Sequence, residues 1–342
     1  MSDATVIAKA TAPGRPPRLG FLGAGPSARD RMRAIAASGV AEVAAVADPS
    51  MTLLHELEGI VPGAVRLGTL DELLRQPLDG IVIAPSGAPD ATPALRALEA
   101  GIPAFCQPPL AATTAATRAV IAVARRANLR LGVDLPYRCT EAMRVLRSVV
   151  QAGELGDVYA IDLVFHGAGA VDGPRDPALP DAGSDAGCVV ELGAQVIDLA
   201  LWTLGFPRVT SVRSRRYARG ELLPRGASVP EDYAAALLEL DTGATMRLAC
   251  SWNLPTGRQA VIEVSFYGTD GGGSFRNVPG SASDFTAELH RGTSRHPLAS
   301  PPDAWRGRAA LDWARDVALG ARYDPWIEGL IDVASAVDAL LE

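Results

Sequence analysis

The chain has 342 residues, of which 48% are hydrophobic, and a formal net charge of −7 at pH 7. This length exceeds what one ordinary hydrophobic core accommodates and predicts two domains. The negative charge argues against nucleic acid as a partner, because phosphate binding needs a concentrated basic face. No apolar run is long enough to span a membrane.

The four cysteines, Cys106, Cys139, Cys188 and Cys250, lie far apart, without a C-x-x-C pair or companion histidines. This spacing predicts reduced thiols in a cytoplasmic protein and no metal site. Residues 1–16 are small, polar and punctuated by proline, which predicts a flexible leader that lacks a signal-peptide core. They contain the only lysine of the chain, so no lysine is available to a folded active site.

Residues 18–48 are predicted to form a strand, a glycine turn, a helix and a second strand that ends at an acidic residue. The turn matches the G-x-G-x-x-G/A pattern of dinucleotide sites, and its candidate binding residues are Gly23, Gly25, Pro26, Ser27 and Ala28. The first glycine allows the tight turn, the second lets backbone N–H groups approach a pyrophosphate, and the alanine keeps the helix close to the strand. The N-terminus of that helix would face the phosphates.

The acidic residue is Asp48, at the distance from the glycines where a carboxylate can accept hydrogen bonds from a ribose 2′-OH. The same carboxylate would repel a 2′-phosphate, so the sequence favours NAD over NADP. The alternative interpretation is a Rossmann-like fold that binds no nucleotide.

Further strands and helices alternate up to residue 133, as is typical of a parallel sheet. Strands are predicted at 78–84, 103–106 and 129–133, with helices at 92–100 and 115–128. Ligands of open α/β sheets bind at the carboxyl ends of the strands, which adds Pro85 and Ser86 to the candidate cofactor-binding residues.

The pattern changes after residue 137. Helices are predicted at 140–152, 187–204 and 326–341, and strands at 158–166, 209–219, 232–240, 244–253, 259–267 and 285–290. Consecutive antiparallel strands with few helices predict an open α+β sheet with one covered face. We therefore expect a Rossmann domain at 17–136, which the final helix at 326–342 could join, and an α+β substrate-binding and oligomerisation domain at 137–325. The Gly/Pro/Asp-rich loop at 168–186 is a candidate lid.

Four segments resemble the glucose–fructose oxidoreductase / inositol dehydrogenase / MocA family, in a likeness that covers residues 18–342. They are LEAGIPAFCQPPLA, ELGDVYAIDLVFHG, GCVVELGAQVIDLALW and VSFYGTDGGGSF. The resemblance implies an NAD(P)-binding domain, a substrate-binding sheet that also builds a dimer or tetramer, and a final helix that returns to the Rossmann domain. It also implies oxidation or reduction of hydroxyl or carbonyl groups on sugars, cyclitols and related small molecules.

The family's chemistry residues are where this sequence departs from the pattern. The Glu-Lys-Pro motif falls on Gln107-Pro108-Pro109, so proline stands at the lysine position, while the second bond can still be cis. By this alignment Gln107 and Pro108 are candidate cofactor contacts. The D-x-x-x-H motif falls on Glu191 and Gln195, where an amide replaces the histidine. The polar residues of the A-T-P-N-x-x-H loop fall on Gly87 and Asp90.

An amide cannot carry a proton near neutral pH, so another group would have to do so. The candidate catalytic residues are Glu191, Tyr137, His166 and, as a hydrogen-bonding neighbour, Gln195. Each has a plain alternative: a helix–sheet interface for the polar helix face, a packing ring for the tyrosine, an ordinary strand-end histidine for His166. Asp198 is predicted to be structural, and the plain alternative for Arg138 is an ion pair between domains.

Three hypotheses remain open at this stage. The first is an atypical NAD(P)-dependent oxidoreductase that acts on a small polar substrate through a rewired proton relay. The second is a redox-neutral lyase, cyclase or isomerase on the same fold, and the third is a nucleotide-binding regulatory protein without catalysis. The first is preferred, because the glycine turn and the acid that follows the second strand are both retained.

Overall fold

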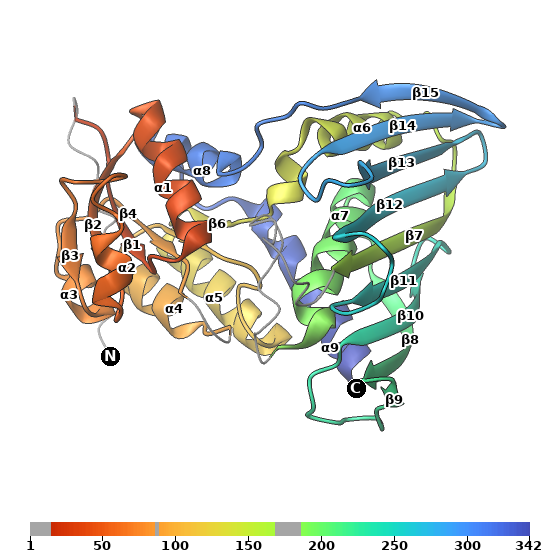
Figure 1. Cartoon of the computed structure of the whole chain (residues 1–342), viewed down its shortest axis with the longest axis horizontal. Coiled ribbons are helices and arrows are strands. Elements are labelled where there is room, and N and C mark those ends of the chain that lie inside the picture. Colours follow the sequence, from red (N-terminus) through yellow and green to blue (C-terminus); the bar gives the residue numbers. More distant parts are fainter. Residues whose placement is uncertain (1–14, 86–88, 168–185) are drawn as a thin grey trace. The chain divides into compact units, whose positions relative to one another are not determined.

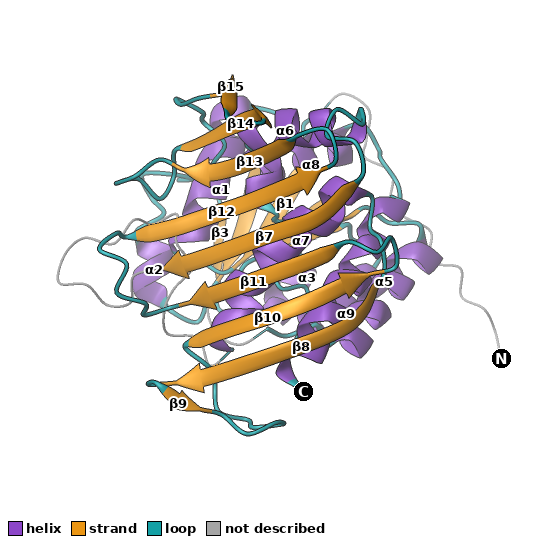
Figure 2. Cartoon of the chain, turned by 90° about the vertical axis from the view of Figure 1, so that its right-hand side faces the viewer, coloured by secondary structure: helices purple, strands orange, loops and turns teal. Residues whose placement is uncertain are grey.

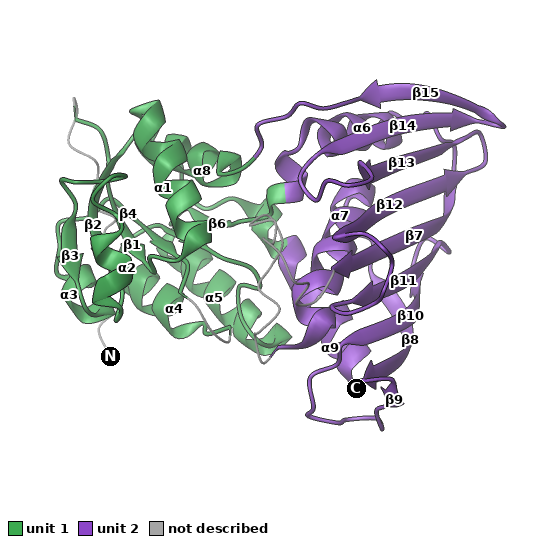
Figure 3. Cartoon of the chain, in the orientation of Figure 1, with its two compact units in different colours: residues 1–136, 306–328 green, residues 137–305, 329–342 purple. Residues whose placement is uncertain are grey.

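The computed structural model describes residues 15–85, 89–167 and 186–342, and it divides into two compact units (Figure 3). Unit 1 comprises residues 1–136 and 306–328, and unit 2 comprises residues 137–305 and 329–342. None of the helices in the described ranges combines the length and the apolar character that a membrane span requires.

Unit 1 is built on a six-stranded parallel sheet in the order β3-β2-β1-β4-β5-β6 (Figure 1). This is the strand order of a doubly wound dinucleotide-binding fold. Its strands are β1 (Arg18–Leu22), β2 (Glu42–Ala47), β3 (Val65–Leu67), β4 (Gly80–Ile83), β5 (Ala104–Cys106) and β6 (Leu131–Val133). Its helical segments are α1 (Pro26–Ser38), α2 (Met51–His55), α3 (Leu70–Leu74), α4 (Thr92–Glu99), α5 (Thr114–Ala127), α8 (Arg308–Ala318) and η3 (Pro325–Glu328).

The core of unit 1 is closed by α8, a helix that the sequence analysis did not predict. The indole of Trp313 packs on the ring of Phe105, with centroids 5.6 Å apart. A Cβ atom on Gly80 or Gly132 would lie 2.7 or 2.8 Å from the same indole. Two glycines in the sheet therefore leave the hollow that this tryptophan fills.

Unit 2 contains a nine-stranded sheet in the order β15-β14-β13-β12-β7-β11-β10-β8-β9 (Figure 2). All neighbouring strands are antiparallel except β7 and β11. The strands are β7 (Val158–Gly167), β8 (Val209–Ala218), β9 (Glu221–Leu222), β10 (Tyr233–Leu240), β11 (Thr245–Ser251), β12 (Ala260–Gly268), β13 (Gly272–Asn277), β14 (Phe285–Arg291) and β15 (Ser294–Ala299). The helical segments are η1 (Pro136–Cys139), α6 (Glu141–Gln151), η2 (Val189–Gly193), α7 (Ala194–Leu204) and α9 (Gly329–Leu341).

Helices α6, α7 and α9 cover one face of this sheet. Helix α6 shows why: Thr140 caps its first turn by accepting the N–H of Met143, and its apolar residues recur at helical spacing. The architecture confirms the predicted fold class, a Rossmann fold followed by a large, open and mostly antiparallel sheet.

The end of the chain differs from the expectation. The resemblance implied a final helix that returns to the Rossmann domain, and the sequence left open where residues 326–342 pack. In the structure α9 packs in unit 2 against α7 and β8, while residues 306–328 complete unit 1. The apolar face of α9, which includes Val333 and Val337, belongs to the core of unit 2.

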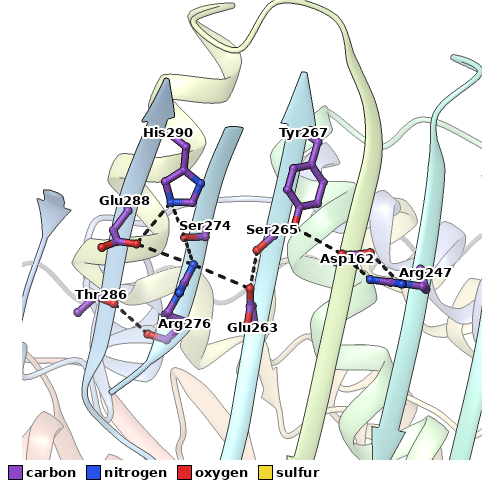
Figure 4. A network of polar contacts seen from close by, with 10 residues as sticks. All are labelled: Asp162, Arg247, Glu263, Ser265, Tyr267, Ser274, Arg276, Thr286, Glu288 and His290. Carbon is purple, nitrogen blue, oxygen red and sulfur yellow. Dashed lines mark hydrogen bonds and ion pairs between the residues drawn. The ribbon is translucent and has the colours of Figure 1, made fainter. Parts of the chain in front are cut away.

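No helix among the described residues of unit 2 covers the other face of its sheet, and this uncovered face carries a row of polar side chains on neighbouring strands (Figure 4). The Arg247 guanidinium makes two hydrogen bonds to the Asp162 carboxylate, at 2.9 and 2.7 Å. Further along the face, Arg276 lies between two carboxylates. Its Nη2 is 4.0 Å from Oε1 of Glu263 and 3.8 Å from Oε2 of Glu288. Opposite charges on adjacent strands thus pair across this face.

Candidate functional site

The glycine turn joins the ends of three strands of unit 1. Gly23 has a φ of +103°, and a Cβ atom there would lie 2.1 Å from the carbonyl oxygen of Ala84. Its N–H donates to the carbonyl of Ala47 at 2.8 Å. Only glycine fits this position, because both the backbone conformation and the close approach exclude a side chain.

Helix α1 begins directly after the turn with its first-turn N–H groups uncapped by any side chain. Gly25 is the N-cap residue, Pro26 occupies the first helical position, and the first turn contains no acidic residue. Pro26 and Ser27 are exposed, whereas Ala28 is 1% exposed and packs into the core. The arrangement fits an anion such as a pyrophosphate, since unpaired donors and the positive helix end point the same way.

Asp48 directly follows β2, beside the turn, and is 7% exposed. Its Oδ2 accepts the N–H of Ala24 at 2.9 Å, and its Oδ1 accepts the N–H of Ser50 at 2.8 Å. Each carboxylate oxygen has a second lone pair, so Asp48 can still accept a ribose hydroxyl. The two backbone hydrogen bonds hold the carboxylate next to the glycine turn.

The loops after β4 and β5 lie at the same edge of the sheet. Pro85 is exposed, and Ser86 and Gly87 lie outside the described residues. The N–H of Gln107 donates to the carbonyl of Ile83 at 2.8 Å, and the bond between Pro108 and Pro109 is cis. The structure thus brings the glycine turn, Asp48, Pro85 and Gln107 to the carboxyl ends of β1, β2, β4 and β5.

Sequence reasoning missed one buried group in this region. Arg31, on the inner face of α1, is 5% exposed and forms an ion pair with Asp134, the residue after β6. The sequence does contain a signal for this buried arginine. Arg31 lies three positions after Ala28, on the helix face that packs on the sheet, where a charged residue is unusual.

In unit 2, the predicted helix at 187–204 begins with a π-helical segment, η2, that carries Glu191. The side-chain amide of Gln195 donates to the backbone carbonyl of Glu191 at 2.6 Å. Single π-helical turns are rare in proteins overall, but those that occur are often found at functional sites. Gln195 therefore stabilises the backbone that carries Glu191.

The start of η2 is fixed by two further buried residues that sequence reasoning missed. Glu231, 3% exposed, accepts the N–H of Val189, and its own carbonyl accepts the N–H of Cys188. The Arg216 guanidinium lies 3.5 Å from the Glu231 carboxylate. Burial raises the pKa of Glu231, and these donors oppose the shift.

Asp198, which is buried, and Arg138, which is half-buried, form an ion pair with two hydrogen bonds, one of them 2.7 Å long. Burial raises the pKa of Asp198 while the guanidinium lowers it. Arg138 also lies over the rings of Trp202 and Phe206. Both residues belong to unit 2, so this ion pair does not join the two units.

The other two candidate catalytic residues, Tyr137 and His166, also lie in unit 2. Tyr137, 3% exposed, packs against the rings of Phe165, Phe285 and Trp305. His166 alternates with Phe165 along β7, which places it on the face of Asp162 and away from the helices. Burial lowers the pKa of His166. The structure therefore does not place His166 on the sheet face against which η2 packs.

The chain matches two family models, one in each unit. A model described as "Oxidoreductase family, NAD-binding Rossmann fold" matches residues 18–135, and one described as "GFO/IDH/MocA C-terminal domain" matches residues 143–273. The chain belongs to the GFO/IDH/MocA family.

Its curated relatives are dehydrogenases and catabolic proteins. The chain is 29% identical to D-glucoside 3-dehydrogenase from Escherichia coli, over 52% of this chain and 53% of the relative. It is 26% identical to the rhizopine catabolism protein MocA from Rhizobium meliloti, over 74% of this chain and 76% of the relative. It is 27% identical to inositol 2-dehydrogenase from Rhodococcus erythropolis, over 66% of this chain and 62% of the relative. The chain thus spans 53% to 76% of the length of these relatives.

Solved structures share the fold over nearly the whole chain. A 3-ketoreductase from Actinomadura kijaniata, in complex with NADP and TDP-benzene, has a TM-score of 0.76 at 20% identity, covering 95% of this chain and 97% of its own. An oxidoreductase from Agrobacterium radiobacter, in complex with NAD+, L-tartaric acid and magnesium, has a TM-score of 0.74 at 18% identity, covering 94% of each chain. Proteins of this fold thus include binders of either cofactor.

Proposed function

We propose that the chain is an NAD(P)-dependent oxidoreductase, with NAD preferred, that interconverts a hydroxyl and a carbonyl group on a small polar substrate. The observation that carries the proposal is the pairing of the Gly23 turn with Asp48, whose carboxylate accepts the N–H of Ala24. A site that bound no nucleotide would have no physical reason to combine a glycine cradle, an uncapped helix N-terminus and this acid. The sugar and inositol dehydrogenases among the relatives support a polyol or sugar-like substrate.

The residues of unit 1 would divide the work of binding. The N–H groups at the start of α1 would bind the pyrophosphate, and Asp48 would accept the ribose hydroxyls and disfavour a 2′-phosphate. When bound, the nicotinamide supplies the hydride acceptor or donor.

Glu191 is our proposal for the group that takes up or delivers the hydroxyl proton. By the resemblance, Pro108 and Gln195 stand where the family has its lysine and histidine, and Gln195 is engaged with the backbone of η2. A carboxylate can exchange a proton near neutral pH where its surroundings raise its pKa. The proton relay would therefore be carried by one carboxyl group.

The first experiment is a calorimetric titration of the purified chain with NAD+, NADH, NADP+ and NADPH, after mass spectrometry for a co-purified nucleotide. Micromolar or tighter binding that is selective for NAD(H) is expected. A screen of polyols, sugars and their ketones for absorbance change at the nicotinamide band would follow. Failure of all four to bind would reject the proposal in favour of redox-neutral chemistry or a regulatory role.

We also propose that the uncovered face of the unit 2 sheet joins copies of this chain. That face carries the paired charges of Asp162 with Arg247 and of Arg276 with Glu263 and Glu288. Long sheets with a bare face usually acquire a cover, and a polar, ion-paired face suits a wet interface. Sedimentation of the purified chain should show a dimer or tetramer, and a monomer at micromolar concentration would contradict it.

A further inference from the structure

Arg31 connects three elements of unit 1 through one buried guanidinium. Its Nε lies 2.6 Å from Oδ2 of Asp134, and its Nη2 lies 2.5 Å from the same oxygen. Its Nη1 donates to Oε1 of Gln107 at 3.3 Å. Arg31 thus links helix α1 to the residues that directly follow β5 and β6, at the carboxyl ends of these strands.

This contact fixes the orientation of the Gln107 side chain. A guanidinium has five N–H donors and no acceptor, so only the oxygen of the amide can face it. The amide NH2 group must therefore face away from Arg31, and it donates to no other residue among those the structure describes. Because Gln107 is half-buried and its own N–H is bonded to Ile83, its amide is presented as a donor from a fixed backbone.

The sheet topology places this donor in one half of the candidate cofactor site. The order β3-β2-β1-β4-β5-β6 divides at β1, with Asp48 on the β2 side. A dinucleotide that extends across such a sheet has its adenosine at the acid and its other end over β4 to β6. Gln107 follows β5, so its amide lies on the nicotinamide side.

We propose that Gln107 is an uncharged hydrogen-bond donor to the carboxamide oxygen of a bound nicotinamide, and that Arg31 is the residue that positions it. The inference rests on the proposed function and adds a specificity element to that site. Residues 108–112 are proline, leucine and alanine, so none of them offers a side-chain donor beside that of Gln107. Arg31 acts only through the amide it holds.

The test compares three ligands by calorimetry on the full chain: NAD+, nicotinic acid adenine dinucleotide and ADP-ribose. Gln107→Glu keeps the shape and an acceptor for Arg31 but removes the donor. We expect about tenfold weaker NAD+ binding, a loss of one hundredfold or more for the nicotinic acid analogue through carboxylate repulsion, and unchanged ADP-ribose binding. Equal affinities of the variant and the natural chain for NAD+ and for the nicotinic acid analogue would overturn the inference.

A second variant tests the positioning role. Arg31→Lys keeps a positive charge beside Asp134 but cannot reach both partners with a planar fork. NAD+ binding should weaken several-fold while ADP-ribose binding stays unchanged, because only the amide orientation is lost. Equal losses for both ligands would indicate a merely structural residue and overturn the role. If ADP-ribose and NAD+ both fail to bind the natural chain, the proposed function itself has failed.

Discussion

The Glu231 carboxylate holds the backbone of Val189 through a 2.9 Å hydrogen bond, two residues before Glu191 in the η2 segment. The second carboxylate oxygen faces Arg216, and the two side chains are 2% and 6% exposed. A Cβ atom on Gly187 would lie 2.4 Å from the Glu231 carboxylate, which explains the glycine before the helix. The start of η2 is therefore built around a buried ion pair.

The first prediction concerns this pair. Glu231→Gln still accepts the Val189 N–H but leaves the Arg216 charge buried without its partner, at an expected cost of about 3–5 kcal/mol in the free energy of unfolding. Urea denaturation measures it. Arg208→Gln, which removes an exposed partner of Asp241, is the matched control and should cost under about 1 kcal/mol. Similar losses in both variants would show that the buried Arg216–Glu231 pair contributes no more to the free energy of unfolding than an exposed ion pair does.

The second prediction concerns catalysis. Glu191→Gln should lower turnover by about 10²–10⁴-fold, because a general acid or base is lost, while the dissociation constant for NADH changes less than about twofold. Steady-state rates and calorimetry measure the two quantities. Glu58→Gln, a change at an exposed carboxylate, is the control and should alter neither. Unimpaired turnover would remove Glu191 as the proton carrier.

The third prediction separates binding from chemistry. Asp48→Ala removes the proposed acceptor for a ribose hydroxyl and also frees the N–H groups of Ala24 and Ser50. We expect NADH to bind at least about tenfold more weakly and the preference over NADPH to shrink, with turnover at saturating cofactor largely kept. Calorimetry with the two reduced cofactors tests this. An unchanged ratio of the dissociation constants for NADH and NADPH would contradict the role proposed for Asp48.

The fourth prediction is a pH dependence of stability. Burial lowers the pKa of His166 below its ordinary value of 6.5, so the unfolded chain binds a proton before the folded one does. This contribution is fully present above pH 6.5 and is lost as the pH falls through the folded pKa. His166→Gln should flatten the decline in unfolding free energy as the pH falls below about 6.5, as measured by urea titrations at each pH. Parallel curves for both proteins would exclude His166 as the cause.

The fifth prediction tests the closure of unit 1. Trp313→Ala should cost about 3–5 kcal/mol in the free energy of unfolding, because it empties the hollow above Gly80 and Gly132. Trp326→Ala is the natural comparison, since that indole is 59% exposed and its removal should stay within about 0.5 kcal/mol. Calorimetric scans of both variants provide the measurement. A small effect at Trp313 would mean that α8 is dispensable for the core.

Most of the architecture could be predicted because its signals are local. The glycine turn, the apolar runs of β1 and β4 and the alternation along β10 specify their elements within a few residues. Strand β13 was missed because it opens with two glycines, one of which makes room for Leu146 at 2.6 Å from its missing Cβ. Helix α8 was not predicted, although its buried residues, Ala310, Trp313, Ala314 and Val317, recur at helical spacing.

The supporting groups of the site were less accessible to sequence reasoning, because they act between distant segments. Arg31 meets Asp134 across 103 residues, and Glu231 meets Val189 across 42. A buried charge has no periodic signature, and only the fold shows which charge it faces. The side of the sheet on which His166 lies also depended on a register that the sequence leaves uncertain by one residue.

The indole of Trp313 also sets an order of events during synthesis. The sheet of unit 1 is complete at β6, but its last helical cover comes from residues 306–328, after all of residues 137–305. At about 5–20 residues per second, the hollow formed by Gly80 and Gly132 stays open to solvent for on the order of ten seconds or more on the ribosome. An apolar sheet face of this kind is a surface that a chaperone recognises, so the yield of the folded chain should depend on chaperone supply more than its final stability would indicate.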